Sequence, residues 1–160
     1  MYRIAFCFYL LVFFVSCHDI KEKTGKDLSG KVVSIADGDT FTLLTNEKAQ
    51  IKIRLHGIDC PEKKQDFGQV AKQKLSDLIY GKIVRAVKTD IDRYRRTVAL
   101  VYDENNNCIN EEMLNAGLAW HYTKYDNNPV WQQMEDSARA SHLGLWQQSN
   151  PTPPWEWRRK

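Results

Sequence analysis

The chain has 160 residues, a length that favours one domain with a single sizeable core and argues against several domains. Its 23 Lys and Arg residues barely exceed its 20 Asp and Glu residues, which leaves a formal net charge of +3. A charge this small rules out identifying a partner from the overall balance, because nucleic-acid binding depends on where basic residues cluster.

The first 17 residues have the composition of an export signal. Arg3 precedes an apolar run from Ile4 to Val15. The run is too short to cross a bilayer as a mature helix, but it fits the hydrophobic region of a secretory signal peptide. It ends in FVSC, where a small residue directly before Cys17 resembles a bacterial lipoprotein signal. We therefore expect an exported protein, either a cell-envelope lipoprotein anchored through Cys17 or a freely secreted form.

A polar segment separates this signal from the first predicted strand. Residues 18–29 contain no apolar periodicity and are interpreted as a tether. Beyond it, the body of the chain contains Cys60 and Cys108. An oxidising compartment would permit a disulfide between them. Sequence alone does not establish that they are close enough, so the question stays open at this stage.

Three strands are predicted first. Residues 31–37 and 40–44 are β-rich runs separated by a Gly-Asp pair that is typical of a tight turn. Residues 49–58 then alternate between apolar and polar side chains, which indicates a half-buried strand. The alternation puts Arg54 and His56 on the polar face, and we expect His56 to be an exposed strand residue.

A helix and two further strands follow. Residues 67–82 carry apolar side chains at helical spacing, with a glycine near the end as a stop signal. Residues 82–89 and 95–102 are two more β-rich runs, joined by a charged turn at residues 90–94.

The second half of the chain is predicted to be helical. Residues 109–117 indicate a short helix that ends on a glycine. Residues 128–144 indicate a longer one, with Asn128 as its cap and Pro129 in the first helical position. The expected apolar face of this longer helix consists of Val130, Trp131, Met134 and Ala138.

This order of elements predicts a mainly β chain of the α+β class. Five short strands with a helix inserted after the third indicate a small closed barrel, such as the five-stranded OB-fold, with about three helices packed on it. We assign residues 30–148 to this domain. Residues 149–160 form a Pro- and Trp-rich tail that is expected to break regular structure and to wrap over the surface, with Trp155 and Trp157 as anchors.

Two groups of carboxylates flank the strand that carries Arg54. One is the DGD turn of residues 37–39, and the other is DCPE at residues 59–62. Turns at strand ends can bring such groups together around a hard cation, which needs oxygen ligands. Zinc on His56 and Cys60 is disfavoured, because the chain has no CxxC or HxxxH spacing.

Five motifs, taken in chain order, resemble the staphylococcal nuclease (thermonuclease) family. They are IADGDT, RLHGIDCPE, FGQVA, DRYRR and GLAWHYTKY. The resemblance extends from about Lys31 to Trp146, and the terminal PPWEWRR also looks like endings of secreted members. Each motif alone is a weak signal, and their shared order makes the resemblance specific.

The resemblance implies a calcium-dependent phosphodiesterase on an OB-fold. Such an enzyme hydrolyses DNA and RNA at the 5′-oxygen and leaves 3′-phosphate products. By motif position, the calcium carboxylates correspond to Asp39 and Asp59. Cys60 falls where the family typically supplies a threonine backbone carbonyl, and a carbonyl ligand survives a change of side chain.

The resemblance also implies the catalytic residues. Arg54 and Arg96 match the two phosphate-binding arginines, and Glu62 matches the glutamate usually assigned as general base. These roles make chemical sense, because a cation and two guanidinium groups can neutralise charge that develops on a phosphodiester. The planar fork of arginine suits two phosphate oxygens, and a carboxylate can deprotonate the attacking water.

Other positions are expected to contact nucleic acid. Arg93, Tyr94 and Tyr125 match further substrate contacts of the family, whereas Thr123 replaces one of its two tyrosines. The family's usual Tyr-Gly-Arg is Tyr-Arg-Arg here. If its middle position needs a positive φ, Arg95 strains the turn. An added phosphate contact is the equal alternative for this residue.

Three function classes remain to be separated. The first is an exported nuclease, the second a non-catalytic OB module that binds single strands, and the third a structural lipoprotein. Only the nuclease accounts for the joint presence of two metal carboxylates, two arginines and a base. The preference between DNA and RNA is not readable from the sequence, and we expect a monomer.

Overall fold

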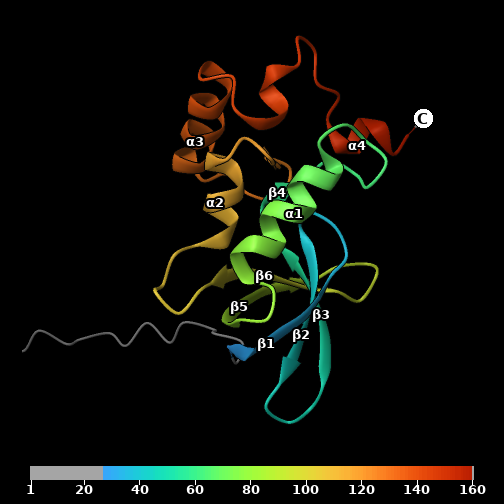
Figure 1. Ribbon diagram of the computed structural model, residues 1–160, viewed down its shortest axis with the longest axis vertical. Coiled ribbons are helices and arrows are strands. Elements are labelled where there is room, and N and C mark those ends of the chain that lie inside the picture. Colours follow the sequence, from blue (N-terminus) through green and yellow to red (C-terminus); the bar gives the residue numbers. More distant parts are fainter. Residues whose placement is uncertain (1–26, 160) are drawn as a thin grey trace, which may run out of the picture.

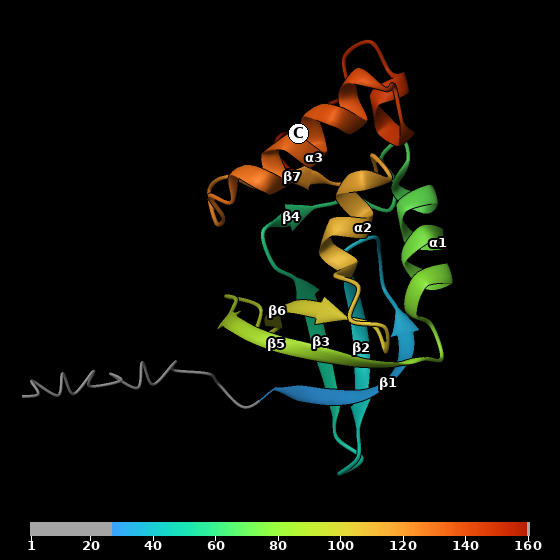
Figure 2. The same cartoon turned by 90° about the vertical axis from the view of Figure 1, so that its left-hand side faces the viewer.

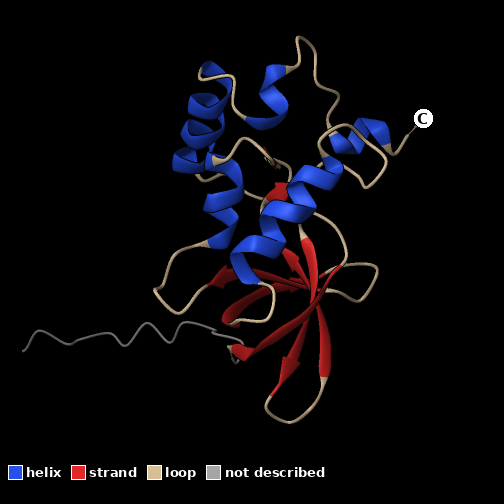
Figure 3. Cartoon of the chain, in the orientation of Figure 1, coloured by secondary structure: helices blue, strands red, loops and turns tan. Residues whose placement is uncertain are grey.

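The computed structural model describes residues 27–159. The predicted signal peptide, the lipidation site Cys17 and most of the predicted tether lie outside the described residues. Strands gather in one half of the molecule and helices in the other (Figures 1 and 3). The long strands are β1 (Leu28–Ile35), β2 (Thr40–Thr45), β3 (Gln50–Leu55), β5 (Ile83–Ile91) and β6 (Thr97–Tyr102).

These strands form one closed barrel in the order β1-β2-β3-β6-β5 (Figure 2). The β3–β6 pair is parallel, and the other neighbouring pairs are antiparallel. Pairing of β1 with β5, from Leu28 opposite Ala86 to Lys31 opposite Ile83, closes the barrel. The predicted five-stranded OB-type barrel of an α+β chain is thus confirmed.

Alternating side chains fill the barrel. In β2, Phe41 and Leu43 are fully buried, and burial of each such side chain stabilises the fold by about 1.5–3 kcal/mol. In β1 the alternation shifts, because a bulge lies between Val32 and Ser34. The bulge returns Ile35 to the interior, just before the chain leaves the barrel for the first carboxylate turn.

The three predicted helices are present. α1 (Gly68–Ile79) covers the barrel with its fully buried Ala71, Leu75 and Ile79 and lies against β1 and α2 (Ile109–Asn115). In α3 (Pro129–Ala140), the Asn128 side chain accepts a hydrogen bond from the backbone N–H of Val130, as expected for a cap. Two short helices complete the set, η1 (Gly144–Gln147) and α4 (Pro154–Trp157).

The strand predicted for residues 49–58 is interrupted. β3 ends at Leu55, Gly57 turns the chain with a φ of 66°, and Ile58–Asp59 form a separate strand, β4. β4 pairs with β7 (Trp120–His121) in a small second sheet that sequence analysis did not predict. This pairing fixes Asp59 outside the barrel wall and beside the helical half of the molecule.

The ends of the domain also differ from expectation. β1 begins at Leu28, two residues before the predicted domain start. The tail was predicted to break regular structure, but its Pro-Pro-Trp sequence starts α4, because proline suits the first helical position. Within residues 27–159, none of the helices has the length and apolarity needed to cross a bilayer.

The predicted apolar face of α3 is confirmed for Trp131, Met134 and Ala138 but wrong for Val130, which is 51% exposed. Glu135, which was not predicted, is buried on the inner side of the helix. The buried carboxylate is tolerated because it accepts hydrogen bonds from the backbone N–H of His121 and from Arg139.

Candidate active site

The predicted functional segments meet at one end of the barrel. There β2 begins, β3 ends and β6 begins, and the pairing register sets Arg54 opposite both Thr40 and Val98. A cleft of about 1270 Å³ opens over this end. Its walls include both carboxylate turns, the loop after β5, the segment from Tyr122 to Tyr125 and the C-terminal tail.

Arg54 links the two carboxylate turns. Its Nη2 donates to Oδ1 of Asp59 at 2.7 Å and lies 3.3 Å from Oδ2 of Asp39. Its Nη1 donates to the carbonyls of Leu55 and Ile58. The backbone N–H of Cys60 donates to Oδ2 of Asp39. The DGD and DCPE motifs, far apart in the sequence, thus form one hydrogen-bonded group.

A glycine allows this close approach. A Cβ at Gly38 would lie 2.7 Å from the Cβ of Ala71 and 2.8 Å from that of Cys60. Any larger residue would therefore push the first carboxylate turn away from α1 and from the second turn. The requirement explains why glycine stands between the two aspartates.

The carboxylates lack full compensation of their charge. Burial, followed by repulsion from Asp39, raises the pKa of Asp37 to about 6. Burial also raises the pKa of Asp59, although hydrogen bonds and charges of Arg158 and Arg54 oppose the shift. The side chain of Asp59 is only 1% exposed. A bound cation would relieve this crowding, so the donor set fits a hard metal ion.

The cation would have few protein side-chain ligands. Across residues 27–159, no three His, Cys, Asp or Glu side chains converge as a ready-made metal cage. Asp39, Asp59 and the carbonyl of Cys60 would hold the ion, and water or substrate would supply the other ligands. Open coordination positions of this kind are typical of a catalytic metal rather than a structural one.

The thiol of Cys60 is unsuited to metal binding. It is buried, and burial together with repulsion from Asp39 and Asp59 raises its pKa well above the ordinary value. A neutral thiol is a poor ligand, because metals bind the thiolate. Cys60 and Cys108 are both free, so they are not bridged to each other.

The Cys60→Thr variant should therefore retain most of the wild-type turnover, because it preserves the backbone carbonyl. A small loss of stability, on the order of 1 kcal/mol, is expected from burying a hydroxyl. Turnover at saturating calcium and thermal unfolding measure the two effects separately. A loss of turnover by several orders of magnitude, in a protein that still folds, would show that the thiol itself is needed.

Arg96 stands directly before β6 and faces the same cleft. Its Nε donates to Asp92 at 2.7 Å, and its Nη1 donates to Oγ of Thr40 at 3.1 Å. The Tyr94 ring lies beneath the guanidinium groups of Arg93 and Arg96, 4.8 and 5.5 Å from its centroid. These contacts hold a guanidinium plane at the cleft edge, which suits a phosphate.

The turn that carries these residues is strained as the sequence suggested. Arg95 has a φ of 64°, in the left-handed region where residues other than glycine are disfavoured by about 1–2 kcal/mol. Asp92 offsets part of the cost, since its Oδ1 accepts the backbone N–H groups of Tyr94 and Arg96.

Glu62 stands in the loop between β4 and α1. Its backbone is fixed, because its N–H donates to Oε1 of Gln65 and its carbonyl accepts from the N–H of Gln65. Its side chain is 36% exposed and its Oε1 accepts a hydrogen bond of 2.7 Å from Arg158. Arg158 also donates to both oxygens of Asp59.

Arg158 was not predicted as a site residue. The PPWEWRR ending was noted only as a family-like feature, and the sole sequence signal was a pair of arginines directly after two tryptophans. Trp155 anchors the tail as expected, while Trp157 is 37% exposed. Sequence patterning cannot reveal that a tail far along the chain returns to the carboxylates of residues 59–62.

Aromatic residues form another wall of the cleft. Tyr122, Tyr125 and Trp155 line it. The rings of Tyr122 and Trp155 stack with centroids 4.9 Å apart, and Tyr125 is 61% exposed. Thr123 is not among the residues of the wall. Exposed aromatic faces beside arginines suit the bases of a nucleic acid.

His56 does not occupy the exposed position that was expected. Its side chain is 20% exposed. Its ring nitrogens lie 3.2 Å from Oδ2 of Asp126 and 3.0 Å from Oγ of Thr89. The prediction failed because Asp126 and Thr89, which come from other segments, lie against the ring and cover this part of the polar face.

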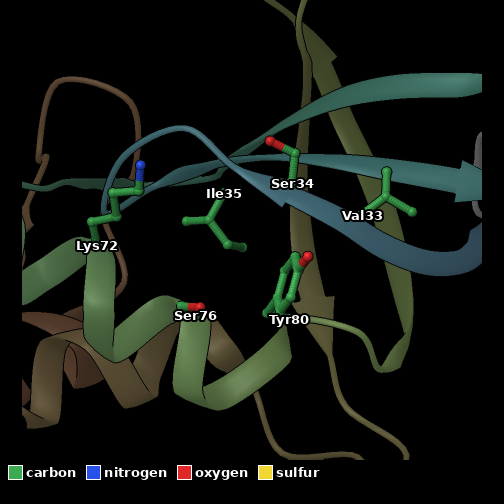
Figure 4. Close-up of a pocket in the computed structure, with 6 residues that line it drawn as sticks. All are labelled: Val33, Ser34, Ile35, Lys72, Ser76 and Tyr80. Carbon is green, nitrogen blue, oxygen red and sulfur yellow. The ribbon is translucent and has the colours of Figure 1, made fainter.

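A smaller hollow of about 250 Å³ lies between β1 and α1 (Figure 4). It is lined by Val33, Ser34, Ile35, Lys72, Ser76 and Tyr80. This set contains one cation and no carboxylate, so it does not offer the chemistry that the large cleft provides.

A barrel of this type, with two arginines, buried aspartates and a glutamate on one cleft, defines a nuclease-type hydrolase. Residues 52–148 match the family model described as staphylococcal nuclease homologue. The chain belongs to the staphylococcal nuclease family. Asp39 and Arg158 lie outside the matched range.

Named relatives agree with this assignment. An "uncharacterized endonuclease" of Haemophilus influenzae is 46% identical over 151 residues, covering 94% of this chain and 82% of the relative. A "micrococcal nuclease" of Shigella flexneri is 40% identical over 144 residues, covering 83% and 82%. A staphylococcal-like nuclease of Arabidopsis thaliana is 39% identical over 142 residues, covering 87% of this chain but 43% of the plant protein.

Proposed function

We propose that this nuclease is a calcium-dependent endonuclease that hydrolyses DNA and RNA at the 5′-oxygen and leaves 3′-phosphate products. The carrying observation is the hydrogen-bonded group of Asp39, Arg54 and Asp59 in one cleft with Arg96 and Glu62. A module that only binds nucleic acid has no need of buried, mutually repelling carboxylates beside its phosphate site.

The two arginines would hold the scissile phosphate. Arg96 is kept in place by Asp92 and Thr40, so its guanidinium loses little freedom when a phosphate arrives. Arg54 is 14% exposed and already oriented by four oxygen acceptors. Two fixed guanidinium groups can stabilise the charge that grows on the phosphate oxygens as water attacks.

The aspartates would bind the metal, and Glu62 would act as the general base. Asp39, Asp59 and the carbonyl of Cys60 would hold a calcium ion, which would supply Lewis-acid stabilisation of the phosphate. Glu62 is more exposed than these aspartates and can accept the proton of the attacking water. The aromatic wall with Tyr125 would bind the neighbouring nucleotides, and Arg93 and Tyr94 would add peripheral contacts.

Export is a separate part of the proposal. The apolar run from Ile4 to Val15 and the small residue before Cys17 support export by a signal peptide, with a lipid anchor at Cys17. Calcium is also more available outside the cytoplasm than within it, which suits an enzyme that depends on the ion. We expect a monomer.

Calcium removal should abolish turnover. Plasmid DNA and RNA should be cleaved when calcium is present, remain intact in excess chelator, and be cleaved again when calcium is restored. Magnesium should support little activity, because it demands stricter octahedral geometry than this site supplies. The products should accept a 5′-end label without prior dephosphorylation, because a 3′-phosphate product carries a free 5′-hydroxyl; labelling only after dephosphorylation would place the phosphate at the 5′ end.

The competing hypothesis is an OB module that binds without cleavage. It would be favoured if the protein shifts labelled single strands in a gel but never shortens them, with or without calcium. Full cleavage in excess chelator would instead reject the metal requirement, but the protein would still be a nuclease.

A further inference from the structure

The C-terminal tail is docked firmly against the cleft. Pro154 is buried, and Trp155 stacks on Tyr122 at an interplanar angle of 10° while meeting the edge of Trp120. Stacked aromatic pairs contribute about 0.5–1.5 kcal/mol beyond their burial. Residue 158 is therefore presented to the cleft by an anchored helix, α4, rather than by a loose end.

The tail also grips the loop that carries Glu62. The side-chain amide of Gln65 donates to the carbonyl of Thr152, and that of Gln148 donates to Asp66. α4 and the Glu62 loop lie side by side in Figure 1. The tail and Gln148, the residue directly before it, are thus positioned relative to the loop at three places: these two amide bonds and the Arg158–Glu62 pair.

The Glu62 carboxylate depends on the tail for its orientation. Among residues 27–159, Arg158 is its one hydrogen-bond partner, and the bond reaches Oε1. Oε2 stays open to a water molecule. A flexible, 36%-exposed side chain would otherwise sample several rotamers, most of which misdirect the carboxylate.

We propose that Arg158 is a positioning residue that holds the Glu62 carboxylate in the orientation of a general base. The inference rests on the proposed function and deepens it, because it adds to the site a third arginine that lies outside the matched family range. The guanidinium is charged at every working pH, so the pair persists throughout.

Arg158 also forms hydrogen bonds to Asp59. The contact with Glu62 predicts an effect on turnover, whereas this second contact predicts an effect on calcium binding. Nη2 lies 2.7 Å from Oδ2 of Asp59, and Nη1 lies 3.2 Å from Oδ1. A guanidinium there competes with a cation for the same carboxylate. Loss of Arg158 should therefore leave calcium binding as tight as in the wild type or tighter, while turnover falls.

The test uses the full chain with Arg158→Ala, Arg158→Lys and Lys63→Ala. Arg158→Ala should lower kcat on the order of 10- to 100-fold with KM changed only a few-fold. Arg158→Lys should recover part of the loss, since one donor can still reach Glu62, and it keeps the test available if the alanine variant folds poorly. Lys63→Ala is the matched control: Lys63 directly follows Glu62, is exposed and does not line the cleft, so the variant removes one positive charge nearby and its kcat should stay close to wild type.

A double variant shows whether the arginine acts through the glutamate. Adding Arg158→Ala to Glu62→Gln should cost no further turnover, because the base is already absent. A further 10- to 100-fold loss would overturn the proposal and assign Arg158 to the phosphate. Tryptophan fluorescence checks that Trp155 stays docked, and calorimetric titration with calcium alone measures metal affinity.

Two other results also overturn the inference. A kcat of Arg158→Ala equal to or above wild type would mean that the contact is neutral or blocks the site. Weaker calcium binding in this variant would mean that the loss of turnover acts through the metal.

If the wild type itself does not cleave with calcium, the proposed function fails and the inference falls with it. Normal turnover of Arg158→Ala beside an impaired Glu62→Gln rejects the inference alone.

Discussion

Replacing Glu62 by glutamine should lower kcat by a factor on the order of 10²–10⁴, which is the usual contribution of a positioned general base. Glutamine keeps the size of the side chain and can still accept a hydrogen bond from Arg158, but it cannot take a proton from water. Because the side chain is 36% exposed, stability should change little. Nucleic-acid affinity, measured in a chelator, should also stay close to that of the wild type.

The control for this substitution is Glu104→Gln. Glu104 is exposed in the turn after β6 and does not line the cleft. It should keep wild-type kcat, so that a general effect of removing one negative charge is excluded. Wild-type turnover by Glu62→Gln would show that another group activates the water.

The Arg96→Lys variant should lower kcat by a factor on the order of 10²–10³. This is comparable to the effect of removing one oriented hydrogen-bond donor from a site that stabilises an anion. The charge remains, but a single ammonium cannot bond Asp92 and Thr40 and also present a planar pair of donors to phosphate. Single-turnover rates at saturating nucleic acid report this loss directly.

The same substitution at Arg93 provides the comparison. Arg93 lies in the same loop and packs over the Tyr94 ring. Arg93→Lys should change affinity modestly and kcat hardly at all. Equal losses of kcat in both variants would mean that Arg96 contributes no more to phosphate binding in the transition state than Arg93 does.

The barrel and its helices could be predicted because their signals are local. Apolar alternation in β2 and β3, the cap at Asn128 and the glycine stops each depend on neighbours within a few residues. The pairing of β4 with β7 could not be predicted, since each strand has only two residues and carries no periodicity. His56 was misplaced for the related reason that Asp126 and Thr89, which cover its side chain, come from distant segments.

The site was predictable only in part. Asp39, Arg54, Asp59, Glu62 and Arg96 were proposed from motif positions, and all line one cleft. Their catalytic roles stay predictions. Arg158 could not be found, because its partners Asp59 and Glu62 are nearly a hundred residues away and no local rule joins them. The strain at Arg95, in contrast, followed from a single residue in a recognisable turn.

The closure of the barrel has a kinetic consequence. β1 meets β5 across more than fifty residues, and the parallel β3–β6 pair joins Arg54 to Val98 across more than forty. Non-local pairings of this kind form late and slowly, since loop-closure entropy is lost before contacts compensate it. Arg54 and the two aspartates meet within the β2–β3 hairpin and the turn after it, but Arg96 joins them only through the β3–β6 pairing. A partly folded chain can hold native-like helices and still be unable to cut nucleic acid, so the onset of cleavage marks the moment at which the barrel closes.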